Sequence, residues 1–411
     1  MAQVLQSTLS SFQNLLSWTN NPCTESTSST SPQQIKLPDL IAAFPDAARG
    51  FRINSLCKEI SDASDEWAVE VIGKSDTRVK KATSVNNSRV VLPEQHSGAT
   101  NAEGSQDETL DLKMGLLASM CFPFVDRTQL RICSDLVVWI GLLEHHLACC
   151  TLEAALDCIH QCRILAENEP GFSDIIDTGL PKGLQSILKR LERSPQSNYV
   201  YDRVRLAVHA YLKRLALQLS EPTRAILQNL KSYVAEQRIA GWHTLLFILI
   251  EFAHGLEKLQ SVLQNNAAVR SVGDAAADAI VYALDIFACV GVFGQAGAPI
   301  LSNTNSVTIL AHEQKVDLSR AIERVGSFCA DRLREFSSFQ TALLQESSKS
   351  GDLETEIYVR GLGHCIRGVL YWVFESERYF GRDGGYIRMT LVVERESSTR
   401  NDELEGGDLE E

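Results

Sequence analysis

Two adjacent residues near the end of the chain, Arg378 and Tyr379, have the chemistry to hold an anion. A guanidinium group presents forked donors that are always charged, and a phenol adds a further donor. The acids Glu375 and Glu377 lie beside them, so a structural interpretation is also open. In that case Arg378 pairs with a nearby glutamate and Tyr379 belongs to the core.

A second group of reactive residues, rich in cysteine and histidine, falls within positions 145–162. His145 and Cys149 are four residues apart, as are Cys158 and Cys162, and such spacings could share a soft metal such as zinc. The usual zinc motifs have other spacings, and free cysteine is a common core residue. Both interpretations remain open. We find no glycine-rich phosphate loop, catalytic serine order or nucleotide-binding motif.

The run 358–381 must position Arg378 and Tyr379, and its pattern predicts a central core helix. Apolar residues recur there at three- and four-residue steps, which places them on one buried helical face. Gly361, Gly363 and Gly368 would weaken an exposed helix, so they indicate close packing against neighbouring helices.

Composition narrows the class of protein. The chain has 411 residues and a net charge of −13, which argues against sequence-independent binding of nucleic acid. Apolar residues make up 44% and charged residues 22%, enough for a large core. Eleven cysteines and no apolar leader indicate reduced thiols in the cytoplasm. The most apolar run, 245–250, is too short to span a membrane.

We expect one all-α domain over 35–393, preceded by a polar leader (1–34) and followed by an acidic disordered tail (394–411). Residues 76–111 are polar and irregular, and we interpret them as an insertion or loop. The sequence has no internal repeat and no clear strand pattern. Helices are expected at about 127–150, 151–168, 182–194, 199–219, 223–239, 242–263, 274–293, 315–347 and 354–380.

Two separate stretches resemble the fungal-type class I sesquiterpene synthases. The first is Glu-Arg-Tyr-Phe at 377–380, and the second is the opening IKLPDL at 35–40 with a helix carrying Trp67. The resemblance implies a single helical bundle around an apolar cavity. It also implies that Arg378 and Tyr379 bind the diphosphate of a prenyl diphosphate, most suitably farnesyl diphosphate.

In that family, magnesium ions held between two helices ionise the diphosphate, and magnesium requires oxygen ligands. The first set of ligand positions corresponds here to Glu144, His145 and Ala148, of which only Glu144 is a magnesium-type ligand. The second set, aligned on Asp285, corresponds to three apolar residues: Leu284, Ala288 and Val292. Asp274 and Asp278 have ligand spacing, but they lie at least one helical turn from the expected depth.

The family also places a diphosphate-sensing arginine one helix earlier, in a segment that ends with glycine. That position corresponds to Gln237, with Arg238 next to it. Arg238 is therefore a candidate diphosphate contact, and the alternative is a solvated charge.

The resemblance implies a cyclase that releases diphosphate from farnesyl diphosphate with magnesium as cofactor. The apolar residues at the ligand positions predict that metal-dependent ionisation is severely weakened. A protein that kept the cavity but lost catalysis, and that serves as a prenyl-diphosphate-binding or scaffold protein, is the alternative.

Overall fold

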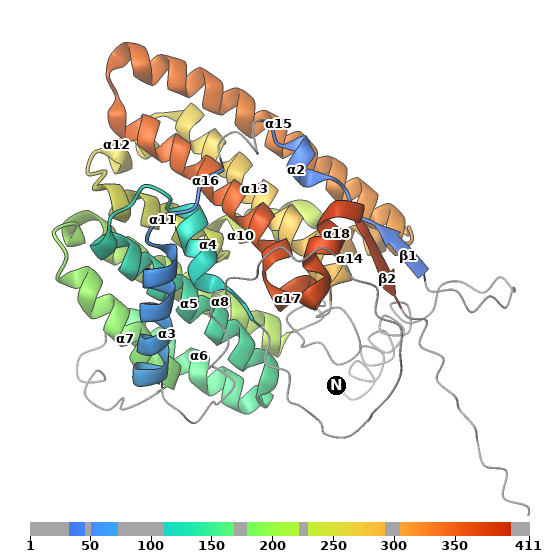
Figure 1. Cartoon of the computed structure of the whole chain (residues 1–411), viewed down its shortest axis with the longest axis horizontal. Coiled ribbons are helices and arrows are strands. Elements are labelled where there is room, and N and C mark those ends of the chain that lie inside the picture. The colour runs from blue at the N-terminus through green and yellow to red at the C-terminus, as the bar shows by residue number, and fades with distance from the viewer. Residues whose placement is uncertain are drawn as a thin grey trace, which may run out of the picture.

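The computed structural model describes residues 33–45, 51–72, 111–167, 179–221, 229–291 and 305–395. The predicted leader, the polar insertion and the acidic tail therefore lie almost entirely outside the described residues. The remainder is a bundle of helices with one small sheet at its side (Figure 1). The all-α prediction is confirmed for this part of the chain.

Most predicted helices are present with shifted ends, and two of them are divided. In chain order, the elements are β1 (Gln33–Lys36), α2 (Leu40–Ala43), α3 (Cys57–Ile72), α4 (Met114–Cys121), α5 (Arg127–Cys149), α6 (Leu152–Glu167), α7 (Gly179–Glu192), α8 (Ser197–Ser220), α10 (Leu230–Ala240), α11 (His243–His254), α12 (Leu259–Asn265), α13 (Ala267–Val290), α14 (Ser306–Gln314), α15 (Leu318–Ser350), α16 (Leu353–Glu375), α17 (Glu377–Phe380), η4 (Gly381–Asp383), α18 (Gly384–Thr390) and β2 (Val392–Arg395).

The first division falls in the segment predicted as one helix over 242–263. There α11 ends at Gly255, which has φ +66° and ψ 45°. This left-handed conformation is favourable for glycine and ends a helix. The chain then starts again as α12, so the single-helix prediction was wrong at this point.

The second division separates Arg378 and Tyr379 from the core helix. Ser376 has extended backbone angles (φ −85°, ψ 152°), so α16 ends at Glu375 and α17 begins at Glu377. The prediction of one helix over 354–380 was therefore wrong at its end. Arg378 and Tyr379 sit on a separate turn of helix, whose direction is not fixed by α16.

The rest of α16 confirms the predicted core helix, because α4, α11, α13 and α15 all pack against it. Its glycines lie at close contacts. A Cβ built on Gly361 would lie 2.6 Å from Cγ2 of Ile250, and one on Gly368 would lie 2.9 Å from Sγ of Cys121. These distances leave no room for a side chain, so the sequence-based explanation of the glycines is confirmed.

The sequence has no clear strand pattern, but the structure adds one short antiparallel pair to the helical fold. β1 and β2 form an antiparallel pair in which Gln33 is opposite Arg395 and Ile35 is opposite Val393. Ile35 and Val393 are buried. Strands of four residues carry too little alternation to be recognised in the sequence.

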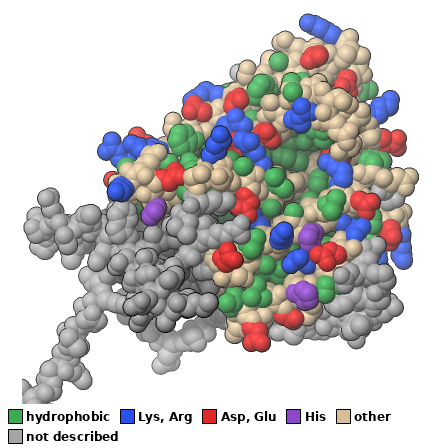
Figure 2. All heavy atoms as spheres, turned by 180° about the vertical axis from the view of Figure 1, so that it is seen from behind, with side chains coloured by type: hydrophobic (Ala, Val, Ile, Leu, Met, Phe, Trp, Pro, Cys, Tyr) green, Lys and Arg blue, Asp and Glu red, His purple; other side chains and the backbone are tan. Residues whose placement is uncertain are grey.

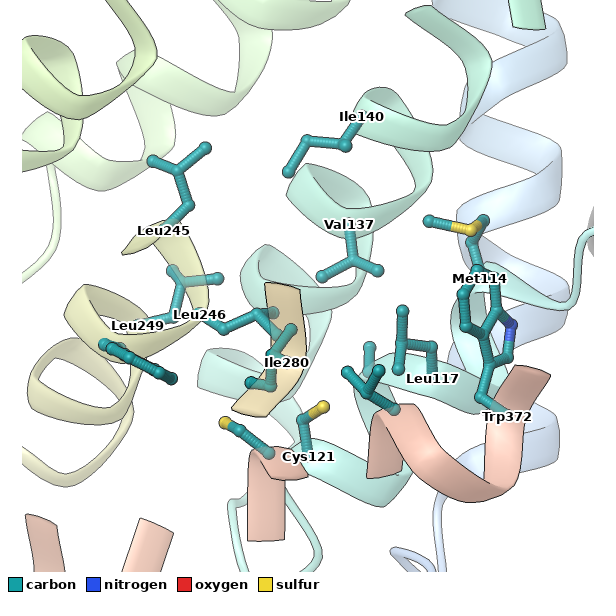
Figure 3. Close-up of a cluster of buried hydrophobic side chains, with 14 of the residues drawn as sticks. Met114, Leu117, Cys121, Val137, Ile140, Leu245, Leu246, Leu249, Ile280 and Trp372 are labelled. Carbon is teal, nitrogen blue, oxygen red and sulfur yellow. The ribbon is translucent and has the colours of Figure 1, made fainter. Parts of the chain in front are cut away.

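Apolar side chains from α4, α5, α11, α13 and α16 point toward one another in the middle of the bundle (Figure 3). Leu117, Val137, Leu246, Ile280 and Trp372 are each at most 1% exposed. The protein interior at this level is closely packed.

Helix α5 is apolar and long enough to cross a membrane by length and composition, and 72% of its most apolar window is buried inside the protein. That burial is typical of a core helix. On the face opposite to Figure 1, acidic and basic side chains are interspersed (Figure 2).

Replacing Gly361 tests the close contact between α16 and α11. Gly361→Val should lower the free energy of unfolding by about 1–3 kcal/mol, because the added atoms overlap Ile250. Urea denaturation measures the change. Gly385→Ala is the control, since nothing lies within 4 Å of its Cβ position. We expect no loss of stability there, because alanine is favoured over glycine within a helix by about 0.5–1 kcal/mol. Equal effects of the two substitutions would contradict this account.

Candidate functional site

A cavity of about 160 Å³ opens at the end of the bundle where α17 meets α5, α8, α10 and α13. Its lining combines polar and apolar side chains from segments far apart in the sequence. The lining residues are Leu112, Glu144, His145, Ala148, Arg214, Leu215, Gln218, Tyr233, Gln237, Trp242, His243, Val281, Leu284, Asp285, Ala288, Asn305, Arg378 and Tyr379. The structure thus brings together Glu144, Asp285, Arg378 and Tyr379 at one cavity.

Arg378 and Glu144 form an ion pair at the cavity. Nη2 of Arg378 donates to Oε2 of Glu144 at 2.6 Å, and the hydroxyl of Tyr211 donates to Oε1 at 2.7 Å. In the structural interpretation of the sequence, Arg378 pairs with a glutamate that is close to it in the chain. The glutamate that it contacts lies 234 positions earlier. Burial alone would lower the pKa of Arg378, but the Glu144 carboxylate raises it above its ordinary value, so the arginine stays charged.

Tyr379 is buried, with its ring edge-on to Trp372 at 5.8 Å, and it also lines the cavity. The Arg378 guanidinium lies 5.7 Å from the centre of the same ring. Burial raises the pKa of Tyr379, so its hydroxyl remains protonated at neutral pH. Tyr379 is thus both a core residue and a cavity residue, and the two interpretations of it are compatible.

Asp285 occupies the other side of the cavity, on α13. Its Oδ1 accepts from the hydroxyl of Tyr233 at 3.2 Å, and its Oδ2 accepts from the backbone N–H of Ser306, at the start of α14, at 2.9 Å. Burial raises the pKa of Asp285 to about 6, against the opposing effect of these hydrogen bonds.

The residues at the expected magnesium positions do not form a magnesium site. Ala148, Leu284 and Ala288 line the cavity with hydrocarbon, and Val292 lies outside the described residues. Both oxygens of Glu144 are already bonded to Tyr211 and Arg378. Among the described residues, no group of three or more His, Cys, Asp or Glu side chains could hold a metal ion. Magnesium needs several oxygen ligands, so the described part of the chain does not fit it.

Arg238 is held by an aspartate beside the cavity. Its Nε and Nη2 both donate to Asp278 at 2.6 Å, and its Nη1 lies 3.5 Å from Asp274. Arg332 also pairs with Asp278 at 2.9 Å. The two aspartates considered as alternative metal ligands are therefore engaged with arginines, while Gln237 lines the cavity.

The cysteine- and histidine-rich stretch spreads over two helices. Sγ of Cys149 lies 3.8 Å from Nε2 of His145 on α5, whereas Cys158 and Cys162 belong to α6. Cys162 is fully buried. These residues, all within the described range, do not gather into a metal-binding group.

The cavity residues that sequence reasoning missed include Arg214 on α8, Tyr233 on α10 and His243 at the start of α11. It also missed Tyr211 on α8, which bonds to Glu144 from outside the lining. Arg214 lies one turn after Tyr211, with its guanidinium 5.5 Å from the tyrosine ring. Burial and the charge of Arg214 lower the pKa of His243 to about 3, so this histidine is neutral. The only sign of these residues in the sequence was that Tyr211 and Arg214 are three residues apart on a predicted helix, which places them on the same face.

Solved structures identify the fold. The structure is similar to germacradien-4-ol synthase from Streptomyces citricolor, with a TM-score of 0.58 and 15% identity over 79% of this chain and 95% of that one. It is also similar to a hedycaryol synthase in complex with nerolidol, with a TM-score of 0.57 and 15% identity over 82% and 99% of the two chains. The fold is that of the class I terpene synthases.

Sequence relatives narrow the class. The family described as "Terpene synthase family 2, C-terminal metal binding" matches residues 144–335. Sesquiterpene synthase 1 of Postia placenta is 26% identical over 72% of this chain and 84% of its own. Sesquiterpene synthase Agr1 of Cyclocybe aegerita is 23% identical over 69% and 79%. These similarities support a fungal-type terpene synthase family for this chain, as a sesquiterpene synthase-like protein.

The pKa of Asp285 predicts a pH-dependent contribution to stability. Its folded-state pKa of about 6 lies above its ordinary value of 3.8, so the folded protein binds the proton more tightly than the unfolded chain. The stabilisation is therefore complete below about pH 4 and is lost as the pH rises through 6. At about 1.4 kcal/mol per pKa unit, the loss is on the order of 2–3 kcal/mol.

Unfolding of the wild type and of Asp285→Asn, measured in urea from pH 4 to 7, tests this. The stability of the wild type relative to the variant should fall as the pH rises. The comparison cancels the opposite contribution of His243, which the variant keeps. A difference that is independent of pH would contradict the raised pKa.

Proposed function

We propose that this chain binds a prenyl diphosphate, farnesyl diphosphate being the best candidate, with the diphosphate in the cavity beside Arg378 and Tyr379. One observation carries the proposal: Arg378 and Tyr379 lie together at a cavity that is lined by both polar and apolar side chains. Farnesyl diphosphate is also consistent with the sequence relatives, which are named sesquiterpene synthases.

In the proposed reaction, the allylic carbon–oxygen bond breaks and its electron pair leaves with the diphosphate. Arg378 and Tyr379 would donate hydrogen bonds to the diphosphate oxygens, where negative charge develops. To do so, Arg378 must exchange its contact with Glu144 for one with the ligand. Apolar walls would shield the resulting carbocation from water.

We propose that metal-dependent ionisation is severely weakened. The family depends on divalent metal, expected to be magnesium, but Ala148, Leu284 and Ala288 offer no oxygen ligands. A metal cluster contributes several kcal/mol of transition-state stabilisation, so loss of most ligands should cost at least about a thousandfold in rate. The function proposed is a terpene synthase with impaired ionisation, in the cytoplasm.

Arg238 is a conditional part of this proposal. Its bidentate contact with Asp278 points its guanidinium at the aspartate. It would contact the diphosphate only after leaving that aspartate, with Arg332 remaining as the partner of Asp278.

A second candidate function is a binding or scaffold protein without catalysis. The observation that favours it is the hydrocarbon at the metal positions, together with the engagement of Glu144 by Arg378 and Tyr211. In that case the cavity would bind the prenyl diphosphate without cleaving it.

Incubation with farnesyl diphosphate separates the two functions. Diphosphate release and volatile hydrocarbons are measured with magnesium and with a chelator. For the enzyme, we expect slow release with magnesium that Arg378→Ala reduces at least about tenfold, the equivalent of one charge-assisted hydrogen bond. Arg382→Ala is the matched control, because this arginine lies four residues on and its side chain is 82% exposed.

No release from any prenyl diphosphate, together with binding that requires Arg378, would favour the binding protein. If the protein neither releases diphosphate nor binds a prenyl diphosphate under any condition, the proposed function is contradicted. Rapid release with magnesium at a rate ordinary for enzymes would contradict the weakened ionisation.

A further inference from the structure

Arg214 is a guanidinium at the cavity that has no acidic partner among the described residues. Its Nε donates to the carbonyl oxygen of Ala240 at 3.1 Å, and its Nη1 donates to Oε1 of Gln218 at 3.0 Å. The carbonyl belongs to the last residue of α10, where the helix dipole is negative. These neutral acceptors fix the orientation of Arg214, and no carboxylate of the described residues forms an ion pair with it at contact distance.

The charge of Arg214 reaches the groups around the cavity. Together with burial it lowers the pKa of His243, and it opposes the rise that burial causes in the pKa values of Asp285, Tyr211 and Tyr233. A partly buried cation without an acidic partner is unfavourable, so an anion in this cavity would be stabilised by it.

Glu144 already occupies the position that such an anion would take at Arg378. Its two carboxylate oxygens accept a guanidinium donor and a phenolic donor at 2.6 and 2.7 Å. Two oxygens of one phosphate group can accept the same pair of donors. Glu144 is therefore an internal anion that competes with any ligand for Arg378.

The other polar groups favour an anionic ligand over a metal ion. Burial raises the pKa values of Tyr211, Tyr233 and Tyr379, so all three remain neutral hydrogen-bond donors. Both oxygens of Asp285 are bonded to Tyr233 and to the N–H of Ser306. The cavity thus presents two arginines and Tyr379, while the oxygens of its two carboxylates, Glu144 and Asp285, already accept hydrogen bonds.

Taken together, these contacts lead us to infer that the cavity binds a phosphate or diphosphate anion without a divalent metal. Arg214 and Arg378 supply the positive charge, and Glu144 is displaced from Arg378 when the anion enters. The inference rests on the proposed function, which puts the diphosphate in this cavity. It goes further in that two arginines, rather than metal ions, neutralise the charge of the diphosphate. The cavity of about 160 Å³ suits such a headgroup, since sites for drug-sized ligands are roughly 300–1,000 Å³.

Isothermal titration of the full chain with inorganic pyrophosphate, in the presence of a chelator, tests the inference. We expect binding without metal that weakens as salt is raised. Arg214→Gln should weaken it at least about tenfold, and Arg214→Lys less. Arg382→Gln is the control and should leave it unchanged, because that side chain is 82% exposed.

Glu144→Gln gives the sharper test, because two roles for Glu144 predict opposite signs. If Glu144 competes with the anion, the variant should bind pyrophosphate at least about tenfold more tightly, since Arg378 is released from an ion pair. If Glu144 is a metal ligand, the variant should bind less tightly and only with magnesium. Thermal unfolding of each variant checks that it is folded.

Pyrophosphate binding that needs magnesium, or that Glu144→Gln weakens, would overturn the inference. Titration with farnesyl thiodiphosphate, a non-hydrolysable prenyl diphosphate, separates this from failure of the proposed function. If that probe binds with magnesium while pyrophosphate does not bind without it, only the inference fails. If neither probe binds under any condition, the proposed function fails as well.

Discussion

The contact between Arg378 and Glu144 holds the site together. It links α17, near the end of the chain, to α5 in its middle, and the second oxygen of Glu144 extends the link to Tyr211 on α8. Both side chains are only partly exposed, at 20% and 16%. Removing one partner of such a pair leaves the other charge without compensation, so the position of this arginine depends on the carboxylate.

Much of the fold could be predicted from periodicity. The buried face of α16 follows from apolar residues at helical spacing, and its glycines follow from contacts such as that between Gly361 and Ile250. The break at Ser376 could not be predicted, because a serine is compatible with a helix and the extended conformation is set by the packing of α17. The short strands were missed because their pairing joins segments that are far apart in the sequence.

The site was predictable only where one segment carried the signal. Arg378 and Tyr379 are adjacent, and Glu144 and Asp285 were found by alignment to a family pattern. Arg214 was not predicted, because its importance depends on where α8 lies relative to α10 and α17. Likewise, the structural alternative paired Arg378 with a neighbouring glutamate, whereas Glu144 comes from a distant helix.

The pairing of β1 with β2 has a consequence for how the protein is made. The side chain of Gln34 bonds to Glu394, 360 positions later, so the two strands cannot meet until both of them have left the ribosome. Closing so long a segment has a high entropic cost, and such contacts form late in folding. α17 and α18 immediately precede β2 in the sequence. The turn that carries Arg378 is therefore synthesised after the helices that receive it, which have been able to pack by then.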